Sequence, residues 1–348
     1  MRILITGAQG YVASAAIPFI RAAYPEAQLV GLDTGYFAPC MLPGVAAPDT
    51  QLHQFIQADL RDFDLGAFGP VDAVVHLAAI SNDPIGNQFE TVTAEVNTAA
   101  VVRLALAAKK LGATRFIFAS SCMVYGEATG GRRKETDPVS PITAYAKSKI
   151  NTENGLAPLA DKSFQVTALR FCTAFGLAPR LRLDLVINDF VASAVTTGKI
   201  EILSDGSPWR PLIHVRDMAR AMIWALGRDG DAFLSLNVGK DENTWQIGEL
   251  AKTVAAALGG VEVSINKDAP PDRRSYKVDF GKFTHLAPDF VPREELTASV
   301  KELEAALRQI DFGSRSFRQS PYVRLHHLRE LQAANELDDE LRWRRRRA

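Results

Sequence analysis

Tyr145 and Lys149 are the side chains of this sequence whose types and spacing are best suited to proton transfer. Because they stand four positions apart, they share one face if residues 143–149 form a helix. A free phenol loses its proton only near pH 10, so a tyrosine is a poor base at neutral pH unless a nearby cation stabilises the phenolate. Lys149 could supply this cation. The alternative is a solvated helix face that also carries Lys147. This alternative has to be weighed because the spacing Tyr-x-x-x-Lys is common by chance.

A glycine turn near the N-terminus could bind phosphate groups. Residues 2–6 are typical of a buried strand, and a helical pattern runs from position 11 to about 23. Between the two, Gly7 permits a tight turn and Gly10 allows the backbone to approach a diphosphate, while Ala13 lets the helix pack closely. Tyr11 and Val12 would then lie at the helix N-terminus, whose free N–H groups favour phosphate.

Asp33 follows the next predicted strand, residues 28–32, and stands 23 positions after Gly10. A carboxylate there can accept hydrogen bonds from both ribose hydroxyls and would repel a 2′-phosphate, so it favours NAD over NADP. An ordinary turn aspartate is the alternative. After a polar loop, a strand at 53–57 leads to Asp59 and Leu60, which could flank an adenine ring.

The elements that must position these groups alternate along the first half. A strand at 71–79 ends in Leu77, Ala78 and Ala79, which would leave room for the middle of a cofactor, and it contains His76, which we interpret as a packed strand residue. A helical pattern follows at 89–111 with Asn97 inside it, and then a strand at 115–119. Alternating strands and helices predict a Rossmann-type, doubly wound parallel sheet with ligands at the C-terminal ends of its strands.

The composition is that of an ordinary globular protein. The chain has 348 residues, 47% hydrophobic and 23% charged, with 40 basic and 40 acidic side chains. This balance gives no reason to expect nucleic acid or an anionic membrane as a partner. The length allows two lobes, and we expect a cofactor-binding domain at 1–170, to which the chain returns up to about 240, and a smaller substrate-binding lobe mainly within 171–348, interleaved with the first.

Cysteine usage favours a reducing compartment. The three cysteines, Cys40, Cys122 and Cys172, are widely spaced and form no Cys-x-x-Cys pair, which argues against a disulfide framework or a metal site. The apolar run at the N-terminus ends at Gly7, too early for a secretory signal, and we find no stretch of about 18 apolar residues. We therefore expect a cytoplasmic protein without a metal or a membrane span.

A longer set of motifs resembles a known family. The strand at 115–119 leads into Ser120-Ser121-Cys122-Met123-Val124-Tyr125-Gly126, and Tyr145 comes 24 residues after Ser121. The glycine turn, Asp33, this serine motif and Tyr-x-x-x-Lys resemble, in this order, the extended short-chain dehydrogenase/reductase family, in particular its NAD-dependent nucleotide-sugar epimerase/dehydratase branch. The resemblance covers nearly the whole chain and continues through residues 169–176 and 210–217.

The resemblance implies the following roles around the cofactor NAD. Tyr145 is the catalytic base or acid, Lys149 binds the nicotinamide ribose and lowers the pKa of the tyrosine, and Ser121 hydrogen-bonds the reacting sugar oxygen. Ser120 is the weaker candidate. Asn97 steadies the strand ends near the cofactor, which is a structural role more than a chemical one. The other cofactor contacts implied are Ala119 and Phe171.

The same resemblance implies a nucleotide-diphosphate sugar as substrate. Arg210 matches an arginine that pairs with the diphosphate, a use that suits its planar fork of donors. Thr173 occupies a position where many members have an asparagine that contacts the phosphates, and Asn188 falls in a helix expected at 185–197. Ser81 completes the expected contacts together with a late arginine, for which the choice between Arg273 and Arg274 stays open.

Cys122 and Met123 depart from the family pattern. In the 4,6-dehydratases of the branch these positions hold an aspartate and a glutamate that transfer protons; methionine cannot do this, whereas a thiol can. We therefore expect epimerisation, most simply at C4 through a transient 4-keto-sugar with the hydride held by bound NAD. The alternatives are a dehydratase that uses Cys122 as its acid, a 4-ketoreductase, and a non-catalytic dinucleotide-sensing protein. Cys122 could also be a small packing residue.

Two further expectations concern surfaces. The pattern that starts at Tyr322 predicts an amphipathic helix, which we expect to cover the small lobe. By analogy with the family, the helices at 89–111 and 144–160 would form the paired-helix interface of a homodimer.

Overall fold

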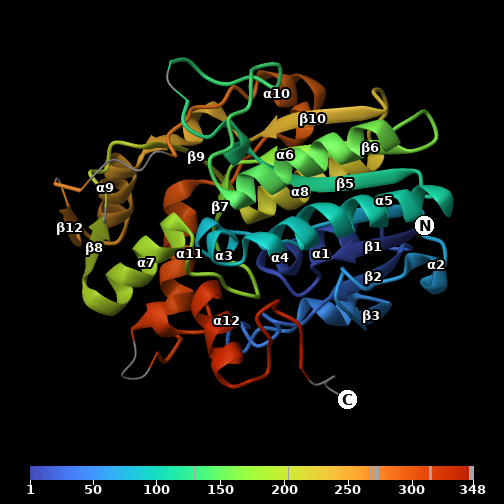
Figure 1. Cartoon of the computed structure of the whole chain (residues 1–348). Coiled ribbons are helices and arrows are strands. Elements are labelled where there is room, and N and C mark those ends of the chain that lie inside the picture. Colours follow the sequence, from blue (N-terminus) through green and yellow to red (C-terminus); the bar gives the residue numbers. More distant parts are fainter. Residues whose placement is uncertain (129, 203, 267, 270–273, 313–315, 345–348) are drawn as a thin grey trace.

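The computed structural model describes residues 1–128, 130–202, 204–266, 268–269, 274–312 and 316–344, and the description below refers to these. Its centre is a seven-stranded parallel sheet with the strand order β10-β6-β5-β4-β1-β2-β3 (Figure 1). The strands are β1 (Arg2–Thr6), β2 (Gln28–Asp33), β3 (Gln54–Gln57), β4 (Ala73–His76), β5 (Arg115–Ser121), β6 (Gln165–Phe171) and β10 (Phe233–Val238). The predicted Rossmann-type doubly wound sheet is therefore confirmed.

Side chains that alternate along the strands fill a core on each face of the sheet. On β1, Ile3 and Ile5 belong to one core and Leu4 to the other. The first core also contains buried residues of α1 (Tyr11–Ala23) and α8 (Val215–Gly227), which pack against each other. The second contains buried residues of α5 (Ala100–Lys110) and α6 (Ala144–Leu156). Helices therefore cover both faces, as a parallel sheet requires.

A separate core forms beyond the ends of the strands. It contains buried residues of α7 (Val186–Thr197), α9 (Ile247–Ala257) and α11 (Leu296–Leu307). A three-stranded sheet, β11 (Thr244–Gln246), β9 (Trp209–His214) and β7 (Thr173–Phe175), and a two-stranded sheet, β12 (Glu262–Ile265) and β8 (Lys199–Ile202), complete this part of the chain. Because β10 lies between these segments in sequence but joins the main sheet, the chain passes more than once between the two cores.

The helical run at 90–110 differs from the expectation of one regular helix. It comprises α4 (Glu90–Ala94), a π-helical turn (Glu95–Ala99) and α5. By length and average apolar composition alone this run could cross a membrane. However, its residues Val101, Leu104 and Ala108 are buried in a core of the fold, as expected for a core helix beside a sheet.

The C-terminal helix does not cover the surface that we expected. In α12 (Arg324–Ala333), Leu328 and Leu331 pack in a small cluster with Ile80 and Phe89 of the first half. An amphipathic pattern indicates which face of a helix is apolar, but it does not indicate which other element that face meets. Residues 316–344, here called the C-terminal segment, therefore lie partly against the cofactor-binding half.

Candidate functional site

The glycine turn has the geometry that phosphate binding requires. Gly7 has φ +70°, and a Cβ atom there would lie 2.6 Å from the backbone nitrogen of Ala78, so only glycine fits. The turn is closed by a hydrogen bond of 2.9 Å from the Gly10 nitrogen to the Gly7 oxygen. Tyr11 is the first residue of α1. The free N–H groups of this helix therefore begin at the turn.

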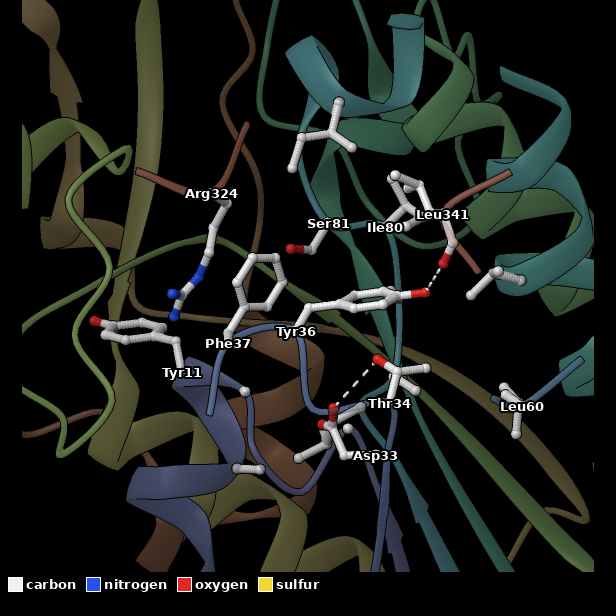
Figure 2. A pocket seen from close by; sticks show the side chains of 18 of the residues that line it. Tyr11, Asp33, Thr34, Tyr36, Phe37, Leu60, Ile80, Ser81, Arg324 and Leu341 are labelled. Carbon is white, nitrogen blue, oxygen red and sulfur yellow. Dashed lines mark hydrogen bonds between the residues drawn. The ribbon is translucent and has the colours of Figure 1, made fainter. Parts of the chain in front are cut away.

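A pocket of about 1080 Å³ of free space, including the solvent at its mouth, opens beside this turn (Figure 2). Most of the expected cofactor residues line it, from the ends of β1, β2 and β4 and the loop after β3. They are Gly7, Gly10, Tyr11, Val12, Asp33, Asp59, Leu60, Leu77, Ala78 and Ala79, and Ser81 lines the same pocket. The C-terminal edge of the parallel sheet thus gathers these residues from separate parts of the sequence.

Asp33 ends β2 and is held by the backbone. One carboxylate oxygen accepts a hydrogen bond of 2.9 Å from the Gln9 nitrogen, and the other accepts one of 2.8 Å from the Gly35 nitrogen. Burial raises the pKa of Asp33, although these two hydrogen bonds and the charge of Arg180 act in the opposite direction. The oxygen bound by Gly35 also accepts a hydrogen bond of 3.5 Å from the Thr34 hydroxyl, and the oxygen bound by Gln9 has a second lone pair available for a ribose hydroxyl.

Asn97 fixes the loop after β4. Its side-chain oxygen accepts a hydrogen bond of 2.8 Å from the Ile80 nitrogen, and its amide nitrogen donates to the Ile80 oxygen and to Ser148 on α6, both at 3.0 Å. The side chain is buried within the π-helical turn. These contacts fit the expected structural role, because they tie a loop that lines the pocket to α6.

Tyr145 and Lys149 lie on α6. Thr143 caps the N-terminus of this helix, because its hydroxyl accepts a hydrogen bond from the Ala146 nitrogen. The ammonium group of Lys149 donates a hydrogen bond of 2.8 Å to the main-chain oxygen of Ala119 on β5. Lys149 is buried and Tyr145 is partly buried. The expected helix face is therefore directed into the protein, and the alternative of a solvated face does not describe these two side chains.

Within the protein alone, the surroundings of Tyr145 raise its pKa, which makes it a poor base. Burial raises the pKa of Tyr145 to about 12, and this effect outweighs the charge of Arg182 and a hydrogen bond to Ser121, which lower it. Burial also lowers the pKa of Lys149 to about 7, against the opposing charge of Glu153. Lys149 was expected to lower the pKa of Tyr145, but it is not among the groups that act on this pKa.

Ser121 and Ser120 point into different surroundings. Ser121 ends β5, interacts with Tyr145 and accepts a hydrogen bond of 3.2 Å from the Met123 nitrogen. Ser120 instead donates to Glu153 in a buried network, in which Arg170 forms hydrogen bonds of 2.7 to 3.2 Å with the same carboxylate. Of the two serines, Ser121 is the one placed to meet a substrate beside Tyr145.

Cys122 lies in the hydrophobic core. Its exposure is 0%, and its Sγ atom donates to the main-chain oxygen of Arg170 at 3.0 Å. Phe171, an expected cofactor contact, belongs to the same core at the end of β6, 3% exposed. Neither residue lines the pocket described above. The packing interpretation of Cys122 therefore has more structural support than a role as an acid.

Two expected substrate arginines lie near tyrosine rings or their charged neighbours. Arg210 lies with its guanidinium carbon 5.7 Å from the centre of the Tyr276 ring. Arg274 forms an ion pair of 2.6 Å with Asp83, whose charge acts on both Tyr145 and Tyr276. Thr173, partly buried, begins β7, which pairs with the strand of Arg210. Arg273 lies outside the described residues.

Asn188 is placed differently from the expectation of a substrate contact. It is completely buried, its side-chain oxygen accepts from the Gly176 nitrogen at 3.0 Å, and its amide nitrogen donates to the Arg182 oxygen at 2.8 Å. The side chain therefore holds the 176–182 loop in place instead of facing a ligand, and we propose no substrate contact for it.

Several residues that line the pocket were missed. Arg182 pairs with Asp184 at 2.7 Å and donates to the Ser81 hydroxyl at 2.9 Å. Tyr36 and Phe37 were assigned only to a polar loop, although an aromatic pair so soon after Asp33 was a usable signal. The others, from the same loop, the loop after β4, α3 (Asp83–Gln88), the 90–110 run and the C-terminal segment, are Thr34, Ile80, Ile85, Val92, Val96, Arg324, Leu328 and Leu341.

Several known proteins have sequences related to this chain. Residues 3–239 match the model of a family described as the NAD dependent epimerase/dehydratase family. A UDP-glucose 4-epimerase of Lacticaseibacillus casei is 28% identical over 65% of this chain and 72% of its own length. A dTDP-D-glucose 4,6-dehydratase of Mus musculus is 26% identical over 67% of each chain. Both kinds of enzyme therefore occur among the relatives.

A solved structure extends the similarity to the three-dimensional fold. MoeE5, determined in complex with UDP-glucose and NAD, is 27% identical and superposes with a TM-score of 0.74. The match covers 89% of this chain and 99% of that one. The similarity thus includes both the main sheet and the second core.

Proposed function

The chain belongs to the NAD dependent epimerase/dehydratase family, and we propose that it acts within this family as a nucleotide-sugar epimerase at C4. One contrast carries the proposal. Tyr145, Lys149 and Ser121 are present together, whereas Met123 has no group that transfers protons and the thiol of Cys122 is buried against a main-chain oxygen. The site thus has the groups for oxidation and re-reduction, whereas positions 122 and 123 offer no accessible proton donor for the elimination of water.

The pocket residues fit the cofactor NAD. The glycine turn and the start of α1 would hold its diphosphate, and the carboxylate of Asp33 would accept hydrogen bonds from the adenosine ribose. Bound NAD supplies a hydride acceptor and donor. Lys149, with its ammonium group fixed by the Ala119 oxygen, would contact the nicotinamide ribose.

The chain's own residues would handle the proton. When the C4–H bond gives up its hydride, the C4 hydroxyl loses a proton to the Tyr145 oxygen and the C4–O bond becomes a carbonyl. Ser121 would donate a hydrogen bond to this oxygen. A positive charge on the neighbouring nicotinamide would oppose the effect of burial on the Tyr145 pKa, so the tyrosine would gain basicity only in the loaded site.

The reverse step completes the reaction. The keto-sugar would turn over in the pocket so that its opposite face can accept the hydride, and Tyr145 would return the proton to the C4 oxygen. The net reaction consumes no reductant and needs no acid other than Tyr145. Arg210 and Arg274 would bind the diphosphate of the nucleotide sugar, and the Asp83 that now pairs with Arg274 would then face the sugar.

Mass spectrometry in deuterated water tests this proposal against its alternatives. The protein would be incubated with a panel of nucleotide hexoses, and the products would be separated and analysed by mass and NMR. Epimerisation keeps the mass and introduces no deuterium at C4, because the hydride comes from the sugar itself. Dehydration loses a molecule of water, and a 4-ketoreductase would add two hydrogens to a keto-sugar. Either result, without an epimer, would contradict the proposal.

We also propose that the protein is a homodimer built through α5 and α6. The resemblance to the family supports this, and Leu106 on α5 is exposed to 40%. Light scattering should give twice the monomer mass at micromolar concentration, and Leu106→Glu should give the monomer mass. A monomeric wild type would contradict the proposal.

A further inference from the structure

The C-terminal segment reaches the adenosine side of the pocket. The Trp343 indole donates a hydrogen bond of 2.7 Å to the Thr34 oxygen, and the His327 ring contacts the Tyr36 oxygen at 2.8 Å. The Tyr36 hydroxyl donates to the Leu341 oxygen (Figure 2). The segment is thus attached to Thr34 and Tyr36 in the loop that follows β2, where Asp33 would hold a ribose.

Arg324, at the start of α12, is the buried cation of this segment. The side chain is 3% exposed and lines the pocket, and its guanidinium carbon lies 4.3 Å from the centre of the Phe37 ring. Its two terminal nitrogens, Nη1 and Nη2, are buried and have no hydrogen-bond partner. Figure 2 shows the guanidinium group directed toward the side of the pocket that Tyr11 occupies.

The neighbours of Arg324 do not balance its charge. The Asp184 carboxylate is already paired with Arg182. The Cys40 thiol interacts with Arg324, but burial raises the pKa of this thiol, so it adds no negative charge. In the part of the chain that the structure describes, no acidic side chain forms an ion pair with Arg324. A buried arginine without a counter-charge is costly, so an anion from outside the chain is expected to complete the site.

The pocket indicates which anion this is. Arg324 shares it with Gly7, Gly10 and the start of α1, a helix of 13 residues whose N-terminus favours phosphate. Arg210 and Arg274, the expected contacts of the sugar-nucleotide diphosphate, do not line this pocket. We propose that Arg324 binds the diphosphate of the dinucleotide, so that the C-terminal segment is part of the cofactor site.

This inference rests on the proposed use of NAD and deepens it. An epimerase must keep its cofactor through the cycle, because a cofactor that left after the first half-reaction would take the hydride with it. A charged contact from a segment far along the chain, joined to Thr34 and Tyr36, would slow that departure. The planar guanidinium fork is well suited to the two phosphate groups.

The test compares the nucleotide binding of Arg324→Gln and wild type by calorimetry. ADP-ribose contains the diphosphate and adenosine does not. Loss of a charged hydrogen bond should lower the affinity for ADP-ribose and NAD about 10- to 100-fold and leave the affinity for adenosine unchanged. Arg329→Gln is the matched control, because Arg329 lies on the same helix but binds Gln88 at the surface, and it should bind all three ligands as wild type does.

Several results would overturn the proposal. Unchanged affinity for ADP-ribose is one, and an equal loss for adenosine and ADP-ribose, which indicates general disruption of the pocket, is another. A third is weaker UDP-glucose binding with normal ADP-ribose binding, because Arg324 would then serve the substrate. Without ligand, Arg324→Gln should melt at or above the wild-type temperature. If it does not fold, Arg324→Met replaces it with the same expectations.

These binding measurements involve no turnover. A protein that proves to catalyse another reaction on NAD would still show the difference between ADP-ribose and adenosine. Conversely, unchanged binding by Arg324→Gln in an active epimerase would overturn only the role of Arg324.

Discussion

The ammonium nitrogen of Lys149 lies 5.4 Å from the centre of the Tyr145 ring, one turn along α6. At this distance the lysine is beside the phenol ring, while its ammonium group donates a hydrogen bond to the Ala119 oxygen. On the proposed function, Lys149 would orient the site and Tyr145 would transfer the proton. We make a separate prediction for each of the two residues.

Tyr145→Phe should lose turnover and keep the cofactor. Removal of a general base or acid typically lowers the rate about 100- to 10,000-fold. The product rate is measured by chromatography, and the NAD content of the purified protein is measured in parallel. Turnover within a few-fold of wild type would refute the assignment of Tyr145.

Lys149→Met should change how stability depends on pH. The folded pKa of Lys149 is about 7, below its ordinary value of 10.5, because burial disfavours the charge. Between these values the unfolded chain binds a proton that the folded protein does not, so this group makes wild-type stability rise with pH across the window. Thermal unfolding without nucleotide should show Lys149→Met more stable than wild type at pH 6, with the difference shrinking toward pH 10. Lys147→Met, exposed on the same helix, should show no such trend.

Asp33→Asn should weaken discrimination between the two dinucleotides. The substitution removes the negative charge that would repel a 2′-phosphate, and it replaces one acceptor oxygen by a donor beside the Gln9 or Gly35 nitrogen. The ratio of the dissociation constants for NADP and NAD should fall about 10- to 100-fold. Calorimetric titration with each dinucleotide measures this ratio. An unchanged ratio would mean that Asp33 gives no reason to prefer NAD over NADP.

Cys122→Ala should keep turnover and lower stability. The thiol is in the core and donates to a main-chain oxygen, so its loss should cost about 1 to 2 kcal/mol in the free energy of unfolding, measured with urea. Turnover should stay within a few-fold. If the variant is folded and contains NAD but is inactive, this result would instead indicate that the thiol is a proton donor. The dehydratase alternative would then regain support.

The central sheet could be predicted because its signals are local. A short apolar run, a glycine turn and a helical pattern repeat along the first half, and β1, β2 and β5 lie where the sequence predicts them. The cofactor side of the pocket followed for the same reason, since parallel strands bring their C-terminal ends to one edge of the sheet.

The remaining parts depend on contacts between distant segments. Asn188 was expected to bind substrate, but whether an amide faces a ligand or a loop depends on where residues 176–182 pass, and no local pattern encodes that path. Arg324 had no signal at all, because its importance comes from the pocket that it enters, which is formed by residues near the other end of the sequence. The partner of the α12 apolar face was missed for the same reason.

The position of the C-terminal segment affects the order in which the protein can mature. Gly7 and Asp33 leave the ribosome early, when Arg324 and Leu341 have not yet been synthesised. On the proposed role of Arg324, a nascent chain with a complete parallel sheet would hold the dinucleotide weakly, and firm loading would come only after α12 docks. Cofactor capture would then be a late step of folding.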